Sequence, residues 1–384
     1  MPTSTVAELL NISPVTYRYS LPSDTFVLPG CLIGVEMELE GDVDRDMRND
    51  LVALREAAAN FVSVKEDGSL RNGGVELVFD GPQRGTSAIT ALDHMFRIKE
   101  NYGLLGSFRT STHVHVNYAD IDDTADVLGR SVAIFLLIEK AAAATCGEAR
   151  EYNTFCVPSY MMRPQDEETL LAVAGMDGGT SAEQADFLMR RISSLHRYAA
   201  MNLAALYRFG TIEYRLLGTA SRDVTYNWVN LLLEIKKAAS TMTRSDILAH
   251  SSFLAFIRHV LPRCGDYLVY NDEVEAHYRA RRSCLIRETL SEQSVPDEAP
   301  YVPNLIPTED PVPEALRGLR SSTLPYLDGR TVEQALAASA LDHPVELTGT
   351  TVVSDADLAA IFQAAWPGPN RYGPTINFEQ SEGN

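Results

Sequence analysis

The chain has 384 residues, which is enough for one large domain with appendages or for two domains. Hydrophobic residues make up 45% of the chain and charged residues 22%, values typical of a folded globular protein, so wholesale disorder is excluded. Asp and Glu number 52 against 33 Lys and Arg, and the resulting net charge of -19 argues against nucleic acid or an anionic membrane as the main partner.

The five cysteines include no CxxC pair and are odd in number, which favours reduced thiols and predicts a cytoplasmic location. The first residues lack the basic and apolar regions of a signal peptide. The most apolar stretch, 131–144, contains Glu139 and Lys140, so we expect a buried helix there and no membrane span.

Hydrophobic periodicity predicts alternating strands and helices. In chain order we expect an irregular lead-in over 1–30, a strand over 31–40, a helix over 45–62, turns at 67–69 and 72–74, a strand over 75–80, a helix over 85–100, a strand over 111–118, helices over 123–146, 165–173 and 181–206, a strand over 210–217, and helices over 224–239 and 245–260. Residues from about 291 are rich in proline and acidic side chains, as in a linker or extended arm. These features predict one domain over 1–290, followed over 291–384 by an arm, a small helical appendage and a tail.

The four strands share one unusual feature, which is an apolar face opposite a face of carboxylates and imidazoles. In the first strand Val35, Met37 and Leu39 point one way, and the intervening glutamates point the other way. The second face carries Glu36, Glu38 and Glu40 on the first strand, Glu76 on the second, His113 and His115 on the third, and Glu213 and Arg215 on the fourth.

Carboxylates gathered on one face repel each other unless a cation lies between them. An oxygen-rich site with few imidazoles suits Mg²⁺, or Mn²⁺, better than zinc. Arg215 on the same face adds a planar fork for phosphate or carboxylate. The alternative is an ordinary solvent-facing sheet face with two satisfied histidines and a weak ion pair between Glu213 and Arg215.

The order of these motifs resembles the glutamine synthetase and glutamate–cysteine ligase superfamily. More specifically, the segments GVEMELE, KEDGSL, GVELVF, THVHVN and GTIEYRLLGT are similar to the amidoligase family, whose members are carboxylate–amine ligases. The resemblance covers roughly residues 31 to 240 and implies an α+β fold. In that fold a curved antiparallel sheet carries a metal site on its concave face, and helices cover its apolar face.

The resemblance also implies roles for residues at matching positions. Mg²⁺ (or Mn²⁺) would be held by Glu36, Glu38, Glu76 and His113, with Glu213 as a further ligand near the transferred phosphoryl group. His115 and Arg215 would contact the phosphates of ATP or an acyl-phosphate. Asp67 and Ser69, in the DGS turn, would line the acceptor side, and Asn202 would lie near the site. Arg109, Lys65 and Arg150 could each reach phosphate.

The implied reaction has two steps. A substrate carboxylate attacks the γ-phosphate of ATP, and an amine then displaces phosphate from the acyl-phosphate to form an amide or isopeptide bond. Water must be excluded from the acyl-phosphate, and residues Gly175–Ser181 are the predicted lid. No GxxxxGK[ST] phosphate loop occurs, so ATP use rests on the resemblance.

The expected partners are a small-molecule or peptide carboxylate, an amine acceptor and possible further copies of the chain. Two other functions remain open at the level of sequence. The first is a metal-dependent hydrolase that uses the HxH pair and the carboxylates. The second is a catalytically inactive ligase fold that serves as a structural or interaction protein, for example in a phage particle.

Overall fold

The computed structural model describes residues 4–10, 26–41, 51–58, 61–67, 70–107, 109–176, 182–193 and 195–291. Four predictions fall wholly or mostly outside these ranges: most of the irregular lead-in over 1–30, the 291–384 arm and appendage, Ser69 of the DGS turn, and the Gly175–Ser181 lid beyond Met176. They stay predictions, as does the division of the chain into two regions.

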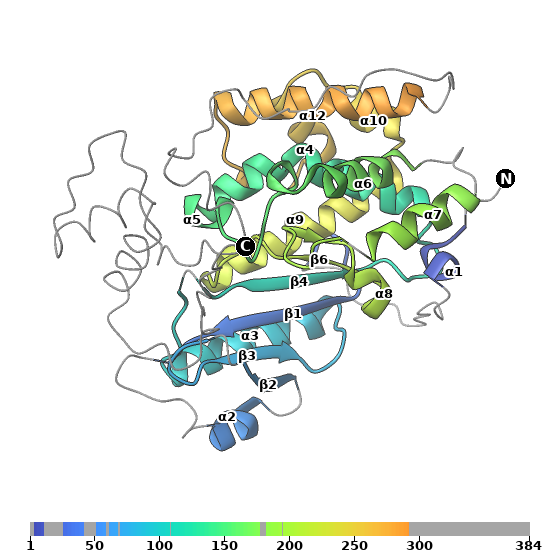
Figure 1. Ribbon diagram of the computed structural model, residues 1–384. Helices are drawn as coiled ribbons and strands as arrows, with labels where there is room; N and C mark the ends of the chain where they lie inside the picture. The colour runs from blue at the N-terminus through green and yellow to red at the C-terminus, as the bar shows by residue number, and fades with distance from the viewer. Residues whose placement is uncertain are drawn as a thin grey trace, which may run out of the picture.

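An antiparallel sheet forms the centre of the protein (Figure 1). Its strands are β1 (Ile33–Leu39), β2 (Val62–Glu66), β3 (Val75–Phe79), β4 (Thr112–Asn117), β5 (Met201–Asn202) and β6 (Thr211–Tyr214), in the spatial order β2-β3-β1-β4-β6-β5. The four predicted strands are β1, β3, β4 and β6. The two outermost strands were not predicted, because β5 is only two residues long and β2 follows directly on a segment with helical spacing.

Helices surround the sheet, and together the two kinds of element confirm the α+β class. They are α1 (Val6–Leu10), α2 (Leu51–Ala58), α3 (Gly85–Asn101), α4 (Ala125–Cys146), α5 (Glu148–Glu151), α6 (Pro164–Gly175), α7 (Ala182–Ile192), α8 (Ala205–Phe209), α9 (Arg222–Thr241), α10 (Arg244–Leu248), α11 (Phe253–Val260) and α12 (Asp272–Ser291), with short 3₁₀ turns at Ser159–Met161 and Gly265–Tyr267. In the described part, no helix is long and apolar enough to cross a membrane.

Three predicted helices need correction. The helix over 181–206 ends at Ile192, because the chain then pairs with β6 as β5 and restarts as α8. The helix over 245–260 is divided into α10 and α11 by a turn at 249–252, where Ser252 caps α11 by accepting from the N–H of Ala255. The helix over 45–62 ends at Ala58, since Val62 already belongs to β2.

Buried apolar residues alternate with partly buried glutamates along β1, which shows which face of the sheet packs into the core. Val35, Met37 and Leu39 are fully buried, whereas Glu36 and Glu38 between them are only partly buried. Helix α3 packs against β1 and β2, and α9 packs against β4, so these two helices lie behind the sheet in Figure 1. The apolar face therefore contributes to the core, and the glutamate face is left for other contacts.

Helix α4 is the buried helix that the sequence predicted, and it lies between α9, α6 and α12. The two charged residues of its most apolar stretch, Glu139 and Lys140, both have polar partners. Glu139 accepts hydrogen bonds from the backbone and the hydroxyl of Ser159, and Lys140 donates to Glu151 at 2.5 Å. Hydrogen bonds and ion pairs of this kind are what allow ionisable groups inside a packed helix layer.

Candidate functional site

The register of the sheet places the predicted site residues opposite one another in pairs on neighbouring strands. Glu36 lies opposite His113, and Glu38 lies opposite Glu76. His115 lies opposite Glu213 on β6. Directly opposed residues of an antiparallel pair project from the same face, so one face carries all six of these side chains.

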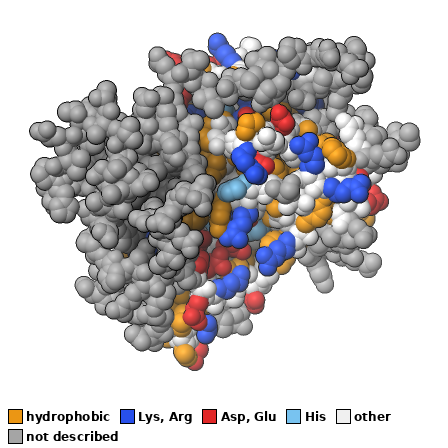
Figure 2. Space-filling model, in the orientation of Figure 1, with side chains coloured by type: hydrophobic (Ala, Val, Ile, Leu, Met, Phe, Trp, Pro, Cys, Tyr) orange, Lys and Arg blue, Asp and Glu red, His pale blue; other side chains and the backbone are white. Residues whose placement is uncertain are grey.

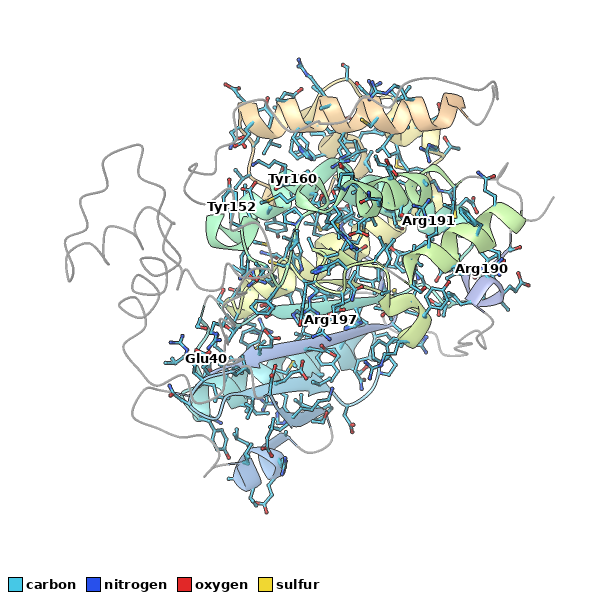
Figure 3. The ribbon with its side chains drawn as sticks, viewed as in Figure 1. Glu40, Tyr152, Tyr160, Arg190, Arg191 and Arg197 are labelled. Atoms are coloured by element: carbon cyan, nitrogen blue, oxygen red, sulfur yellow. The ribbon has the colours of Figure 1, made fainter. Side chains whose placement is uncertain are left out.

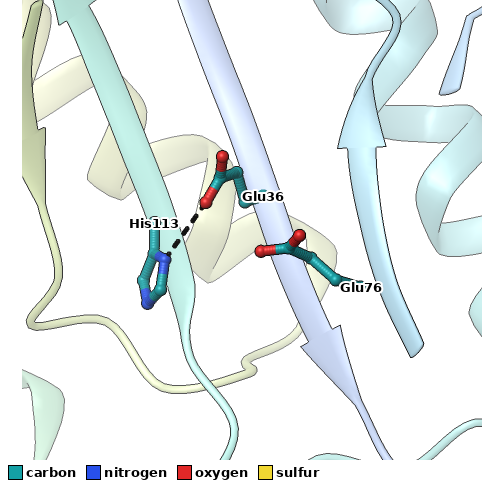
Figure 4. Close-up of side chains that lie close together, drawn as sticks. All are labelled: Glu36, Glu76 and His113. Carbon is teal, nitrogen blue, oxygen red and sulfur yellow. Dashed lines mark hydrogen bonds and ion pairs between the residues drawn. The ribbon is translucent and has the colours of Figure 1, made fainter. Parts of the chain in front are cut away.

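His113 lies between carboxylates from three strands, and Figure 4 shows two of them, Glu36 and Glu76. Its Nδ1 is 3.4 Å from Glu36 Oε2 and 3.4 Å from Glu213 Oε1. Its Nε2 is 3.0 Å from Ser111 Oγ and 3.8 Å from Glu38 Oε1. The imidazole is almost fully buried, so its orientation is fixed by these neighbours.

His115 has one satisfied and one unsatisfied nitrogen. Its Nδ1 lies 2.9 Å from Thr211 Oγ1, which fixes the ring. Its Nε2 is buried and, within the described residues, has no hydrogen-bond partner, although Glu36 Oε1 is 3.7 Å away. In the tautomer whose Nδ1–H donates to Thr211, this buried nitrogen is an acceptor beside the acidic cluster and is available to a cation.

Glu213 is held at both carboxylate oxygens. Asn202 Nδ2 donates to its Oε2 at 2.7 Å, and the Arg215 guanidinium forms a close ion pair with Oε1. Arg215 is itself fixed, because its Nε donates to the carbonyl of Phe155 at 3.1 Å. The β6 carboxylate is therefore pre-oriented toward the two histidines.

Glu38 and Glu76 lie toward the β3 side of the site. Ser111 donates to Glu38 Oε2 from both its N–H and its hydroxyl, each at 2.8 Å. Lys65 on β2 lies opposite Glu76 and approaches its carboxylate at 3.7 Å, with more than half of the lysine side chain exposed. Lys65 thus brings a cation within 4 Å of this side of the acidic cluster.

The carboxylates do not share the same ionisation behaviour. Burial, together with the charges of Glu36 and Glu38, raises the pKa of Glu76 to about 8. Burial acts to raise the pKa of Glu36 as well, but the hydrogen bond from His113 and the neighbouring imidazole charges outweigh it and lower that pKa to about 2. Divergent pKa values within one cluster are the signature of like charges held close together.

Two groups of donor atoms have the spacing of a metal site. The first is Glu36, Glu76 and His113, and the second is Glu36, His115 and Glu213, and within each group the atoms lie within 4.8 Å of one another. Both groups share Glu36, and each offers two carboxylates and one imidazole. Such a donor set fits a hard divalent cation whose remaining positions are filled by water or substrate oxygens.

The other predicted residues lie at the margins of this face. Glu40, at the end of β1 (Figure 3), binds the backbone and guanidinium of Arg71 and stabilises the turn before β3. Arg150 donates to the backbone carbonyls of Leu216 and Arg215, which supports the end of β6. Asp67 directly follows β2, and Arg109 is buried in the loop before β4; their proposed roles toward substrate and phosphate stay predictions.

Two supporting residues were missed by the sequence reasoning. Ser111 and Thr211 each stand at the start of a strand and bond a site histidine or glutamate. Ser111 had a weak signal, since it precedes His113 by two residues and so shares its face. Thr211 also shares a face with Glu213, but nothing in the sequence links it to His115, because that contact crosses from β6 to β4.

The fold and the site together define a class of protein. It is an α+β protein whose open antiparallel sheet carries a carboxylate–imidazole cluster suited to divalent cations. A family model described as "putative amidoligase enzyme" matches residues 34–235, which is more than half of the chain and includes all six clustered side chains. The chain therefore belongs to this amidoligase family, and the resemblance read from the motifs is confirmed. A comparison with curated proteins finds no match.

Proposed function

We propose that this protein is an ATP-dependent carboxylate–amine ligase that uses Mg²⁺ or Mn²⁺ on the acidic face of the sheet. The family supports a ligase-type enzyme. The observation that carries the metal-dependent part is the pair of donor groups sharing Glu36, with the unsatisfied Nε2 of His115 directed at the same cluster. Glutamine-synthetase-like curvature of the sheet belongs to the same proposal.

In this proposal, one group of residues binds the cations and another contacts the phosphoryl group. Glu36, Glu38, Glu76, His113 and Glu213 would hold the cations, whose chemistry is to neutralise phosphate charge during phosphoryl transfer. His115 and Arg215 would contact the transferred phosphoryl group, since both lie beside Glu213 on the same face.

Asn202, Ser111 and Thr211 would keep the site glutamates and histidines in place, because each forms a hydrogen bond with one of them. Outer residues of this type fix ligand geometry before substrate arrives. Asp67, Ser69 and Arg109 would line the entrance to the acceptor and the nucleotide.

The proposed intermediate is an acyl-phosphate, formed when the substrate carboxylate attacks the γ-phosphate and ADP leaves. An amine then attacks the acyl carbon, phosphate leaves, and the amine gives up a proton. The substrates are a small-molecule or peptide acid and an amine.

Hydroxylamine gives a direct test, because it replaces an unknown amine and converts an acyl-phosphate into a stable hydroxamate. The protein would be incubated with ATP, Mg²⁺, hydroxylamine and a panel of free amino acids and short peptides. We expect hydroxamate and ADP in equal amounts, dependent on both ATP and Mg²⁺. Glu213→Gln should abolish both products, whereas Glu66→Gln, at the exposed end of β2, should not.

Other outcomes would replace the proposal. Formation of AMP would indicate activation through an adenylate instead of a phosphate. Amide hydrolysis without nucleotide, supported by a transition metal, would indicate the hydrolase. A folded protein that binds neither ATP nor Mg²⁺ would indicate the inactive ligase fold.

A further inference from the structure

Two aromatic–arginine–aromatic triplets border the site on its β5 side. The first is His196-Arg197-Tyr198 and the second is Tyr207-Arg208-Phe209. They flank β5, which pairs with β6 so that Asn202 lies opposite Glu213. This connection is the segment where the predicted helix over 181–206 breaks, so only the folded chain brings both triplets to one edge of the site.

Each arginine stacks on the aromatic residue that follows it. The Arg197 guanidinium carbon lies 4.5 Å from the centroid of the Tyr198 ring, and its Nη2 also donates to the Tyr198 hydroxyl. The Arg208 guanidinium carbon lies 5.0 Å from the centroid of the Phe209 ring. A guanidinium that lies over an aromatic ring can still donate to a ligand from those edge N–H groups that have no other partner.

Each aromatic ring also touches a residue of the site. The Phe209 ring meets the His115 ring edge-to-face, with 5.6 Å between the ring centroids, although residue Phe209 is 53% exposed. Tyr198 lies 5.6 Å from the guanidinium of Arg215, which is paired with Glu213. The two stacks therefore stand directly beside the cluster, and Figure 3 places Arg197 in front of the sheet.

The charge environment separates these two arginines from their neighbours. Arg163 and Arg190 are paired with Asp166 and Asp186. Within the described part of the chain, no carboxylate lies within ion-pairing distance of Arg197 or Arg208, and both are exposed. Two exposed arginines that lie beside the site and are not held by a carboxylate are available to bind an anion.

Figure 2 shows the same contrast at the surface, where Lys and Arg side chains stand beside a patch of acidic side chains on this face. The acidic cluster attracts cations, and Arg197 and Arg208 beside it attract oxyanions. A ligand that spans both must bring an anionic group in addition to the group that meets the cations. His115 also points to a ligand at this edge, because its buried Nε2 has no hydrogen-bond partner among the described residues and its ring contacts Phe209.

We propose that Arg197 and Arg208 form an anion-recognition rim that binds a carboxylate or phosphate group of the ligand in the site. The proposal rests on the ligase function above and narrows its ligand to one with an oxyanion beyond the reacting group. That oxyanion belongs either to the acid substrate, which would then be a dicarboxylate or an acidic peptide, or to the nucleotide.

Calorimetry with the full chain in Mg²⁺ tests this without turnover. One arm titrates the non-hydrolysable ATP analogue AMP-PNP, and the other titrates the dipeptide Glu-Glu and its uncharged-side-chain counterpart Gln-Gln. The variants are Arg197→Gln, Arg208→Gln and the matched control Arg190→Gln, which removes an exposed arginine already paired with Asp186. Arg208→Lys keeps the charge but loses the planar stack.

We expect each rim variant to weaken at least one anionic probe about tenfold, which corresponds to about 1.4 kcal/mol. Arg190→Gln should bind like the wild type, and Arg208→Lys should fall between the wild type and Arg208→Gln. Loss of AMP-PNP affinity alone assigns the rim to the nucleotide. Loss for Glu-Glu, with Gln-Gln bound weakly by every variant, assigns it to the acid substrate.

The proposal is overturned if both rim variants bind AMP-PNP and Glu-Glu as the wild type does. It is equally overturned if the wild type binds neither probe while Mg²⁺ binding shows that the site is intact. Failure of the ligase function is a separate result, because it would appear as absent hydroxamate formation and not as unchanged binding among rim variants. Because the rim residues are exposed, the variants should unfold at the wild-type temperature, which verifies that the fold is intact.

Discussion

Replacing Glu36 with glutamine should remove the response of the protein to divalent cations, because this one carboxylate belongs to both donor groups. A ligand that binds only the folded state stabilises it by about 2.7 kcal/mol at about 100 times its Kd. For a domain of this size, 1 kcal/mol moves the unfolding midpoint by about 2–4 °C. The wild type should therefore gain about 5–10 °C when Mg²⁺ or Mn²⁺ is raised to that concentration.

Glu36→Gln should lose most of the stabilisation by divalent cations, because Glu36 belongs to both donor groups. Removing even an outer residue of a metal site lowers affinity about 10- to 100-fold, and a direct ligand should cost at least the larger factor. At the same cation concentration the remaining stabilisation would then be about 0.4 kcal/mol, a shift of about 1–2 °C. The metal-free variant should stay folded, because glutamine is isosteric and its neutral amide removes one of the charges that, together with burial, raise the pKa of Glu76.

Differential scanning fluorimetry with increasing Mg²⁺ and Mn²⁺, and with EDTA as the blank, measures both midpoints. Glu66→Gln is the matched control, since Glu66 is an exposed glutamate at the end of β2 paired with Arg55, and it should respond like the wild type. The reasoning is refuted if Glu36→Gln keeps the full shift, or if neither cation shifts the wild type.

Three further predictions test the surroundings of the site and the packing that supports it. Asn202→Ala removes the 2.7 Å hydrogen bond to Glu213 and should weaken cation binding about 10- to 100-fold in the same fluorimetric titration. Gly129→Ala, on α4, places a Cβ 2.7 Å from the carbonyl oxygen of Met176. Because this overpacking outweighs the gain in helix propensity, the free energy of unfolding measured in urea should fall by about 1–2 kcal/mol. Burial raises the pKa of Glu139 from 4.5 to about 7. The free energy of unfolding of the wild type relative to Glu139→Gln should therefore be highest below pH 4.5 and fall by about 3 kcal/mol as the pH rises through 7. Urea unfolding across that pH range measures the difference.

Each of these has its own control or opposing result. Asn230→Ala removes an asparagine that accepts from the backbone of Val27, far from the acidic face, and should leave cation binding unchanged. Gly30→Ala adds a Cβ with no atom within 4 Å and should be nearly neutral; an equal loss there would contradict the packing argument for Gly129. A stability difference between the wild type and Glu139→Gln that does not change with pH would show that folding does not raise the pKa of Glu139.

Local sequence pattern was sufficient for the central part of the fold. Strict alternation in β1, β3, β4 and β6 identified the strands and assigned each side chain to a face, because successive side chains of a strand must point to opposite sides. The same pattern failed for β5 and for the end of the helix before it. There the helical spacing of 181–206 was overridden by pairing between Asn202 and Glu213, a contact that no local periodicity encodes.

The sequence by itself therefore determined which residues share the acidic face and which family the motifs resemble. Only the tertiary structure decided how these residues meet: His113 stands opposite Glu36, His115 opposite Glu213, and Glu36 joins both donor groups. Strand order and register are set by non-local hydrogen bonds and by helices that bury the apolar face, so they depend on segments far apart in the chain. The stacked arginines beside the site depend on the same non-local pairing, which is why they were found only once the chain was folded.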